Sequence, residues 1–330
     1  MPIPKSAHLK RDTLSPDIDQ VPTRDGYGIG LVELGEANED VVVLCGDLSE
    51  STRSNKFQEK FPRRFIQMGV AEQNMAAVAV GLALNGKIPF VSTYAVFSPG
   101  RNWDQIRISA CYNNANVKFA GAHTGVSVGP DGATHQALED IALTRVLPRM
   151  KVFAPCDVEE ARKVIHLAAQ LEGPIYFRLS RAPTAAFTSE KTPFAPGKAP
   201  VFYDGKDVAI IAAGPILHSA LLAADRLIER GISCRVINAV SIKPLDEKTI
   251  QDAARQCGAV VTCEEHQIYG GLGSAVAEFL ATTHPVPIEF VGMKDSFGES
   301  GTPEQLLKKY KMDTEAIVDA VRRVVRRKRS

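Results

Sequence analysis

The sequence lacks the features that mark nucleic-acid-binding, secreted and membrane proteins. Its 39 Lys+Arg balance 38 Asp+Glu, and the formal net charge of +1 gives no strong positive field that would attract nucleic acid. The basic run RRVVRRKRS at the end is interpreted as a solvated helix tail. The N-terminal stretch MPIPKSAHLKRDTLSPDIDQ has no apolar segment of signal-peptide length, and no later run is long enough to cross a membrane. We expect a cytoplasmic protein that binds neither nucleic acid nor membrane.

Cysteine pairs and nucleotide-binding glycine motifs are also missing. The six cysteines are scattered without CxxC spacing, which argues against a metal site and against a disulfide scaffold. No GxGxxG opens the first βα unit, and GxxxxGK[ST] does not occur. The sequence therefore indicates reduced thiols, no metal ligands in this chain and no common nucleotide fingerprint.

What the sequence does have is a regular alternation of two patterns. From about residue 24, short β-branched runs alternate with stretches of helical period, which is typical of βαβ units around a parallel sheet. The proline-rich stretch PTAAFTSEKTPFAPGKAP interrupts this pattern, and the alternation then restarts. We therefore predict an α/β protein with two doubly wound domains. The predicted boundaries are an N-terminal extension at 1–23, a first domain at 24–185, a linker at 186–205 and a second domain at 206–330.

The expected strands are short apolar runs followed by turn or cap residues. They are Val41–Leu44, Ile88–Val91, Val117–Ala120, Val152–Ala154, Ile175–Leu179, Val208–Ala212, Cys234–Ile237, Ala259–Cys263 and Ile288–Val291.

One segment of small residues carries a carboxylate near the start of a predicted helix. It reads MGVAEQNMAAVAVGLALNG, and the carboxylate is Glu72. A glutamate in a first helical turn complements the helix dipole and needs no function. The apolar neighbours favour a buried, functional side chain instead. About twenty residues later, Tyr94 and Phe97 stand three apart at a strand end, a spacing that by itself is more often core.

A long polar loop, AHTGVSVGPDGATHQALED, follows another predicted strand. Ligands of α/β proteins bind at the C-terminal ends of parallel strands, so the position itself suggests a site. The loop contains His123, Asp131 and His135. A plain turn at Asp131 and a helix cap at His135 explain these residues about equally well. Arg24 and Arg181 lie near strand ends and could bind phosphate, although an exposed arginine usually serves only solubility.

Together these segments resemble the transketolase group of thiamine diphosphate enzymes. Gly69 to Glu72 matches the family's Gly-x-x-Glu helix start, and Phe97 matches an aromatic position of its pyrimidine pocket. His123 and GPDGATH match its substrate loop, and EEHQIYGGLGSAVAEFL with SFGESG resembles its C-terminal domain. The resemblance covers nearly the whole chain. It implies the C-terminal half of a transketolase, which is a pyrimidine-binding domain followed by a C-terminal domain.

The resemblance implies a role for each candidate residue. Glu72 and His135 would be catalytic. Glu72 would hydrogen-bond the pyrimidine ring of thiamine diphosphate, and the cofactor would also contact Phe97, Tyr94 and Asp47. His135 would bind the reacting oxygens of the donor, His123 the acceptor and Asp131 a sugar hydroxyl. The full set of implied substrate contacts is His123, Asp131, His135, Arg24, Arg181 and Ser51.

Half of a working transketolase is missing from this sequence. In the family, a separate domain with a Gly-Asp-Gly motif holds the cofactor's diphosphate and its metal ion, and no such motif occurs here. The resemblance therefore implies a separately encoded N-terminal subunit that supplies the ligands of Mg²⁺ or Ca²⁺ in an α2β2 assembly. The pair would transfer a two-carbon ketol unit from a ketose phosphate to an aldose phosphate, with pentose phosphates as the default substrates.

Three alternatives remain open at this point. Two are related enzymes: the beta subunit of a 2-oxo acid dehydrogenase and a 1-deoxyxylulose-5-phosphate synthase-like enzyme. The loop favours transketolase over both, because His123, GPDGATH and Arg181 together fit a sugar-phosphate site. The third alternative is a non-catalytic regulatory subunit that keeps the fold without turnover.

Overall fold

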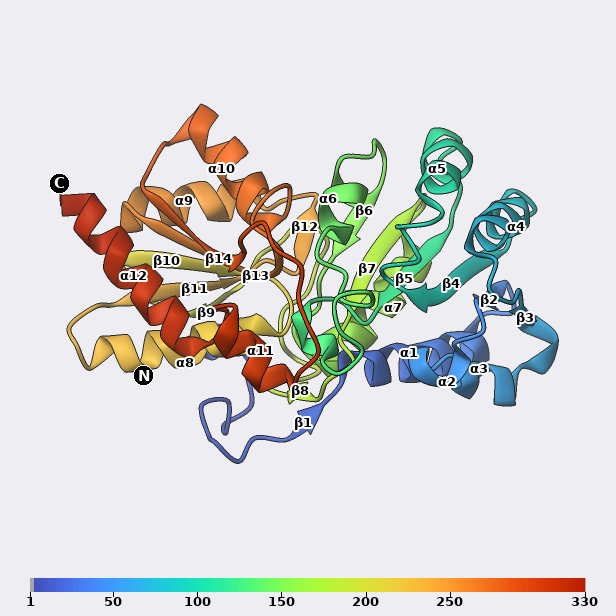
Figure 1. The fold of residues 1–330 in the computed structure, drawn as a ribbon, viewed down its shortest axis with the longest axis horizontal. Coiled ribbons are helices and arrows are strands. Elements are labelled where there is room, and N and C mark those ends of the chain that lie inside the picture. The colour runs from blue at the N-terminus through green and yellow to red at the C-terminus, as the bar shows by residue number, and fades with distance from the viewer. Residues whose placement is uncertain (1–2, 330) are drawn as a thin grey trace.

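The structure, a computed structural model, describes residues 3–329. Residues 1, 2 and 330, which fall in the predicted N-terminal extension and at the end of the predicted second domain, lie outside the described residues. Two α/β units lie side by side along the long axis of the molecule (Figure 1). Between residues 3 and 329, none of the helices combines the length and the apolar character needed to span a membrane.

The first unit is built on a seven-stranded sheet of order β12-β6-β7-β5-β4-β2-β3, parallel except at β12. Its strands are β2 (Val41–Cys45), β3 (Phe65–Gln67), β4 (Ile88–Tyr94), β5 (Lys118–Ala122), β6 (Lys151–Phe153), β7 (Ile175–Leu179) and β12 (Ser241–Lys243). Its helices are α1 (Thr23–Ala37), α2 (Ser49–Thr52), α3 (Asn55–Lys60), η2 (Pro62–Arg64), α4 (Glu72–Leu84), α5 (Trp103–Gln105), the π-helical η3 (Ile106–Tyr112), η4 (Val126–Val128), α6 (Asp140–Arg145) and α7 (Val158–Gln170).

Helices cover both faces of this sheet, because alternate side chains of a strand point to opposite sides. Val41 and Val43 of β2 pack in one core cluster with α1 and α7. Val42 and Leu44 of the same strand pack in another cluster with α4 and η3. The helix that begins at Glu72 therefore lies on the opposite face of the sheet from α1.

The second unit is built on a five-stranded sheet of order β14-β13-β10-β11-β9, parallel except at β9. Its strands are β9 (Val201–Tyr203), β10 (Val208–Ala212), β11 (Cys234–Asn238), β13 (Val260–Gln267) and β14 (Ile288–Met293). Its helices are α8 (Ile216–Ile228), α9 (Glu247–Cys257), α10 (Leu272–Thr283), α11 (Pro303–Lys309) and α12 (Thr314–Arg329). Helices α8 and α12 cover one face, and α9 and α10 cover the other. The predicted α/β fold with two doubly wound domains is confirmed.

Short strands form three further pairings, and one of them, β12 with β6, joins the two units. β12 comes from the second half of the chain but pairs with β6 of the first sheet. β9 lies inside the segment expected as a linker and pairs with β11, while β1 (Gln20–Val21) pairs with β8 (Thr184–Ala185). These pairings were not expected, because two- or three-residue strands carry too little periodicity to be recognised in a sequence. The domain boundaries stated above therefore stay a proposal.

Candidate active site

The candidate residues come from loops at one edge of the first sheet. The neighbouring strands β2, β4, β5 and β7 are parallel, so their C-terminal ends meet at the same edge. Tyr94 ends β4, and His123 directly follows β5. Asp47 lies two residues beyond β2, and Arg181 lies two residues beyond β7. The topology therefore gathers four residues that are far apart in the sequence.

Glu72 begins α4 and is buried, with 4% of its surface exposed. The turn before it passes through Gly69, whose φ of +71° favours glycine. Arg101 donates from Nη1 to the two carboxylate oxygens of Glu72, at 3.1 and 3.3 Å. Asn102 donates from Nδ2 to the Glu72 carbonyl at 3.2 Å. A surface hollow of about 400 Å³ opens over this carboxylate, lined by Val70, Ala71, Glu72, Gln73, Asn74 and Arg101.

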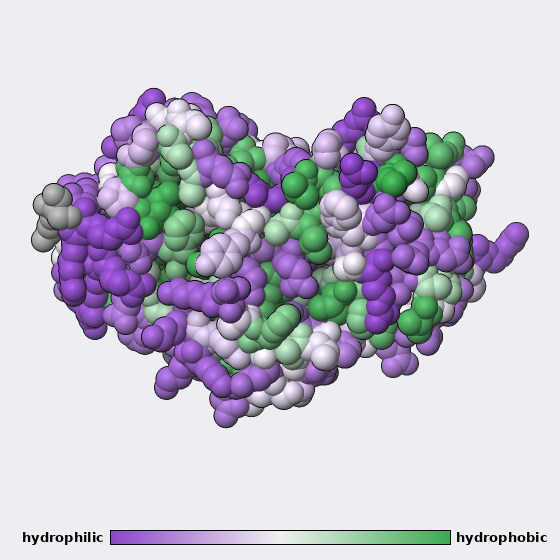
Figure 2. Space-filling view, turned by 45° about the horizontal axis from the view of Figure 1, so that its top comes forward, coloured by the Kyte–Doolittle hydropathy of each residue, from purple (hydrophilic) through white to green (hydrophobic). Residues whose placement is uncertain are grey.

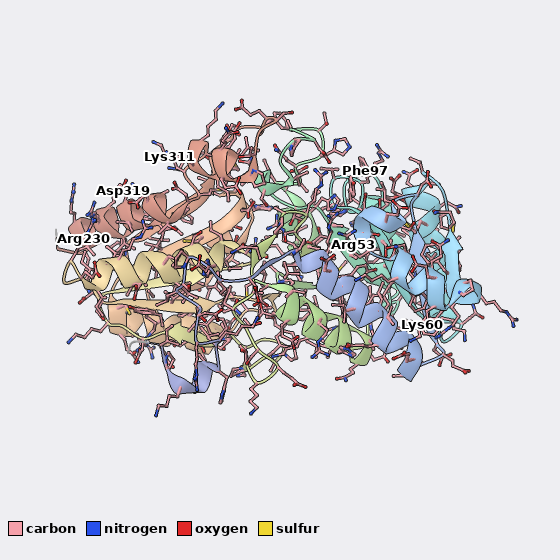
Figure 3. All side chains as sticks on the ribbon, turned by 90° about the horizontal axis from the view of Figure 1, so that it is seen from below. Arg53, Lys60, Phe97, Arg230, Lys311 and Asp319 are labelled. Carbon is pink, nitrogen blue, oxygen red and sulfur yellow. The ribbon has the colours of Figure 1, made fainter. Side chains whose placement is uncertain are left out.

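Two aromatic rings lie beside the Glu72–Arg101 ion pair. The rings of Tyr94 and Phe97 are stacked, with centroids 5.8 Å apart and an interplanar angle of 16°. The guanidinium carbon of Arg101 lies 4.1 Å from the centroid of the Phe97 ring, a cation–π contact. Phe97 lies in the half of the molecule that holds α4 (Figure 3). Arg101 therefore links the Glu72 carboxylate to the aromatic wall.

The sequence interpretation missed Arg101 and Asn102, although both lie in the segment STYAVFSPGRNWDQIR that was singled out for its aromatic residues. A signal was available, since a buried carboxylate needs a partner. The helix that carries Glu72, α4, contains no lysine or arginine. The counter-charge therefore had to come from a neighbouring segment.

His123 is fully buried and adopts a left-handed backbone conformation, with φ of +62°. Its ring lies 4.1 Å from the Tyr94 ring. Its Nε2 is 3.2 Å from Arg24 Nη1 and 3.2 Å from the Ser51 carbonyl, to which Arg24 Nη1 also donates at 2.8 Å. Burial and the positive charges of Arg24 and Arg181 lower the pKa of His123 to about 3. The imidazole is therefore neutral near pH 7.

A neutral imidazole has one donor and one acceptor nitrogen. The two neighbours of Nε2 call for opposite tautomers of His123, because the Arg24 guanidinium can only donate and the Ser51 carbonyl can only accept. Nδ1 is buried and finds no hydrogen-bond partner within residues 3–329. Burial also lowers the pKa of Arg24, and Arg53 adds to the effect.

The loop after β5 contributes the other predicted substrate residues. The ring of His135 meets those of Tyr94 and Phe97 edge-on, with centroids 5.9 and 5.7 Å away. Its Nδ1 lies 2.9 Å from Thr134 Oγ1. Arg181 Nη1 donates to Asp131 Oδ1 at 2.9 Å.

The structure brings most of the predicted residues into one connected group. His123 contacts Arg24, the Ser51 carbonyl and the Tyr94 ring. The Tyr94 ring in turn contacts the rings of Phe97 and His135. Ser51 enters through its backbone carbonyl rather than its hydroxyl. The roles inferred for these residues remain predictions.

Asp47 is placed differently from the rest. It is exposed, has φ of +64°, and its N–H donates to Gln67 Oε1 at 2.9 Å. The same Gln67 oxygen accepts from the N–H of Gly69 at 3.4 Å. Asp47 therefore connects only indirectly to the turn that precedes Glu72.

This arrangement suits one end of a thiamine-type cofactor. A buried carboxylate beside a stacked aromatic pair can hold a flat heterocycle through one hydrogen bond and one ring face. Among the described residues there is no group of three or more His, Cys, Asp or Glu side chains that could hold a metal ion.

Comparison with known families decides between the alternatives. The model described as "Transketolase, pyrimidine binding domain" matches residues 19–185, and the model described as "Transketolase, C-terminal domain" matches residues 197–317. The chain belongs to the transketolase family. It corresponds to the C-terminal half of a transketolase, as the resemblance implied, and the transketolase interpretation prevails over the two related enzymes considered above.

Individual relatives agree with this assignment. The "Putative transketolase C-terminal section" of Methanocaldococcus jannaschii is 43% identical over 90% of this chain and 94% of its own length. The "6-deoxy-6-sulfo-D-fructose transketolase subunit" of a Clostridium species is 39% identical over 92% and 95%. A solved structure of a split-gene transketolase, described as an inactive β4 tetramer, is 48% identical, covers 93% of this chain and 99% of its own, and gives a TM-score of 0.87.

Proposed function

We propose that this transketolase chain works as one subunit of a two-chain enzyme and is active only with a separately encoded N-terminal subunit. The observation that carries the proposal is the Glu72 carboxylate, buried beside Phe97 and Arg101 under a hollow that is open to solvent. In this proposal the chain supplies the pyrimidine-binding side of the cofactor site, and the N-terminal subunit supplies the other side, across the hollow. The related split-gene protein supports a division of the enzyme into two chains.

The proposed cofactor is thiamine diphosphate with Mg²⁺ or Ca²⁺, whose ligands would come from the N-terminal subunit. When bound, the cofactor supplies the electron sink that allows the bond between two carbons of a ketose to break. Glu72 would hold the pyrimidine ring through a hydrogen bond, and Phe97 would stack on it, with Tyr94 lining the same pocket. Asp47 would contact the cofactor from the neighbouring turn.

The substrate side of the site would use the buried imidazole and the arginines. His123 would bind an oxygen of the acceptor sugar through Nδ1, which is buried and has no hydrogen-bond partner within residues 3–329. His135 would exchange a proton with the reacting oxygens of the donor, and Asp131 would bind a sugar hydroxyl. Arg24 and Arg181 would bind the sugar phosphate.

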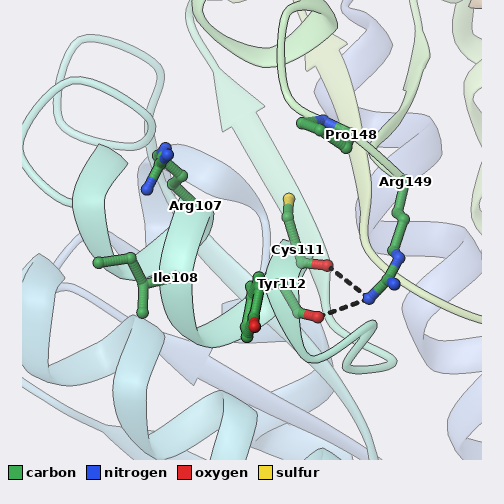
Figure 4. Close-up of a pocket in the computed structure, with 6 residues that line it drawn as sticks. All are labelled: Arg107, Ile108, Cys111, Tyr112, Pro148 and Arg149. Atoms are coloured by element: carbon green, nitrogen blue, oxygen red, sulfur yellow. Dashed lines mark hydrogen bonds between the residues drawn. The ribbon is translucent and has the colours of Figure 1, made fainter.

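The surface around α4 fits a partner subunit. Helix α4 packs against η3, where an apolar hollow of about 400 Å³ is lined by Arg107, Ile108, Cys111, Tyr112, Pro148 and Arg149 (Figure 4). Tyr112 is 80% exposed, Val70 is 71% exposed and Leu84 is 64% exposed. Hydrophobic residues reach the surface at this end of the molecule (Figure 2). We propose that the N-terminal subunit covers this face in an α2β2 assembly, since exposed apolar patches of this kind mark interfaces.

Pentose phosphates are the proposed substrates. The Clostridium relative is named for a sulfonated ketose, so a tetrahedral anion at the end of the sugar is a shared chemical feature. All six cysteines are free and buried, which suits a reducing compartment and supports a place in the cytoplasm.

The proposal is tested by measuring ketol transfer from xylulose 5-phosphate to ribose 5-phosphate with thiamine diphosphate and magnesium. The chain is assayed alone and after mixing with its candidate N-terminal partner. Activity in the mixture alone is the expected result. Binding of partner and cofactor without transfer would keep the cofactor assignment and overturn the choice of sugars, and 2-oxo acids would be the next donors to test.

The Glu72→Ala variant tests the central residue of the site. We expect the mixed enzyme to lose at least about 100-fold in kcat, a typical loss when a proton-transfer group is removed. The fold should survive, because Glu72 lies at the first turn of its helix and its carboxylate faces the hollow. Unchanged melting of the variant, measured by circular dichroism, serves as the control. Turnover close to wild type would refute the assignment.

A further inference from the structure

The loop that carries His123, Asp131 and His135 is held by the C-terminal half of the chain. Val126 and Leu138 from this loop belong to the hydrophobic core of the second sheet, packed with α8 and α12. The short helix η4 within the loop lies against α11. The backbone of the loop therefore depends on packing from outside the pyrimidine-binding domain.

One polar anchor of the loop is Glu265, near the end of β13. Its side chain is buried, with 6% of the residue exposed, and Oε2 accepts the N–H of Ser127 at 3.2 Å. A Cβ atom on Gly125 would lie 2.4 Å from the same oxygen, so the loop passes closely over the carboxylate. Arg178 donates to the Glu265 carbonyl at 2.9 Å and holds the strand end in place.

A second anchor is Gln136, which directly follows His135. Its side chain is 3% exposed, and Nε2 lies within 3.2 and 3.4 Å of the carbonyls of Val126 and Gly129 in the loop. The same nitrogen donates to the carbonyl of Glu299 at 2.9 Å. One amide group thus closes the loop on itself and fastens it to the segment between β14 and α11.

We propose that Glu265 and Gln136 are positioning residues, through which the C-terminal domain sets the place of Asp131 and His135 in the substrate site. Asp131 lies between the two anchor points on the chain, and His135 is adjacent to the second anchor. Neither anchor contacts the predicted substrate residues through its own polar atoms. The inference rests on the function proposed above, because it assigns the loop to substrate binding.

The test compares four variants in the two-chain enzyme. Glu265→Ala and Gln136→Ala each remove one anchor. Glu264→Ala is the matched control, since Glu264 is the preceding buried carboxylate on the same strand, but its oxygens accept the N–H groups of Leu272 and Gly273, at 2.7 and 2.8 Å. Glu265→Gln keeps an acceptor oxygen and should restore the wild-type behaviour.

Each anchor variant is expected to raise KM for the donor sugar about tenfold, the factor that corresponds to the net loss of about one buried hydrogen bond. The affinity for thiamine diphosphate should stay at the wild-type value. Glu264→Ala should lower the melting temperature without changing KM. Unchanged KM in Glu265→Ala and Gln136→Ala, or a loss confined to kcat and melting temperature, would overturn the inference. If Glu265→Ala fails to fold, Gln136→Ala decides alone.

Amide hydrogen exchange on this chain by itself separates the inference from the proposed function. Glu265→Ala should speed exchange at the loop around Ser127 about tenfold, whereas Glu264→Ala should speed it at the start of α10 instead. Absence of sugar transfer by the wild-type pair would overturn the proposed sugars, and absence of partner and cofactor binding as well would refute the proposed function. Unchanged loop exchange in the anchor variant would refute the positioning role whatever the pair does.

Discussion

At the residue scale, the surroundings of His123 carry an excess of positive charge. Arg53 pairs with Asp25 and Arg181 pairs with Asp131, but Arg24 takes part in no ion pair within the part of the chain that the structure describes. Its Nη1 donates to the Ser51 carbonyl and lies beside Nε2 of His123. A guanidinium without a carboxylate partner, at the edge of a proposed sugar site, is available for an anion.

The Arg24→Ala variant should therefore weaken binding of phosphorylated sugars selectively. We expect KM for xylulose 5-phosphate to rise about tenfold to 100-fold, because a charge-assisted hydrogen bond contributes about 1.5 to 3 kcal/mol. KM for free xylulose should change little. Arg53→Ala is the control, since its guanidinium is committed to Asp25 at 2.6 Å. Equal losses for both sugars would show that Arg24 does not bind the phosphate.

At the element scale, α1 and α7 lie unusually close on one face of the first sheet. A Cβ atom on Gly26 of α1 would lie only 2.1 Å from the Val158 carbonyl and 3.0 Å from the Ala161 Cβ. This close approach brings the start of α1, and with it Arg24, against the sheet edge that carries the site. Gly81 on α4 is the opposite case, because nothing lies within 4 Å of a Cβ placed there.

The two glycines should respond differently to the same substitution. Gly26→Ala is expected to lower the free energy of unfolding by about 1 to 3 kcal/mol, since the added methyl has no room. Gly81→Ala should leave stability unchanged or raise it by up to about 1 kcal/mol, because alanine is the better helix former at an exposed site. Urea unfolding of the isolated chain measures both. Equal changes in the free energy of unfolding would mean that α1 and α7 can move apart without loss of stability.

At the scale of the whole molecule, a buried carboxyl group on α7 of the first unit bonds to β11 of the second unit. Glu160 of α7 accepts from Asn238 Nδ2 at the end of β11, at 2.7 Å, and from the Cys156 N–H at 2.8 Å. Asp157, the N-cap residue of the same helix, adds a negative charge nearby. Burial above all raises the pKa of Glu160 to about 7, from an ordinary value of 4.5.

This group makes stability depend on pH in a defined window. Between pH 4.5 and 7 the folded chain holds a proton on Glu160 that the unfolded chain releases, so the group's contribution to stability falls as pH rises. The shift corresponds to about 3 kcal/mol across the window. In Glu160→Gln, the unfolding free energy should lose this slope relative to wild type in urea titrations at several pH values. Parallel pH profiles of the two proteins would contradict the assignment.

Much of the site could be predicted from residue types and their order. Glu72, Phe97 and the histidine-rich loop stand in segments whose pattern resembles a known family, and the structure places these residues at one sheet edge. The partner of Glu72 could not be predicted in the same way. Arg101 is 29 residues away along the chain and meets the carboxylate only because the turn after β4 folds back over the start of α4.

The sequence by itself determined the α/β class, the alternation of strands and helices, and the family, because periodicity and short motifs are local properties of the chain. Tertiary structure alone decided that β12 crosses to the first sheet, that Glu160 bridges the units, and that Glu265 and Gln136 anchor the substrate loop. These contacts join residues far apart in the sequence, and single hydrogen bonds between buried groups leave no periodic trace. Their positions follow only from how the two sheets pack together.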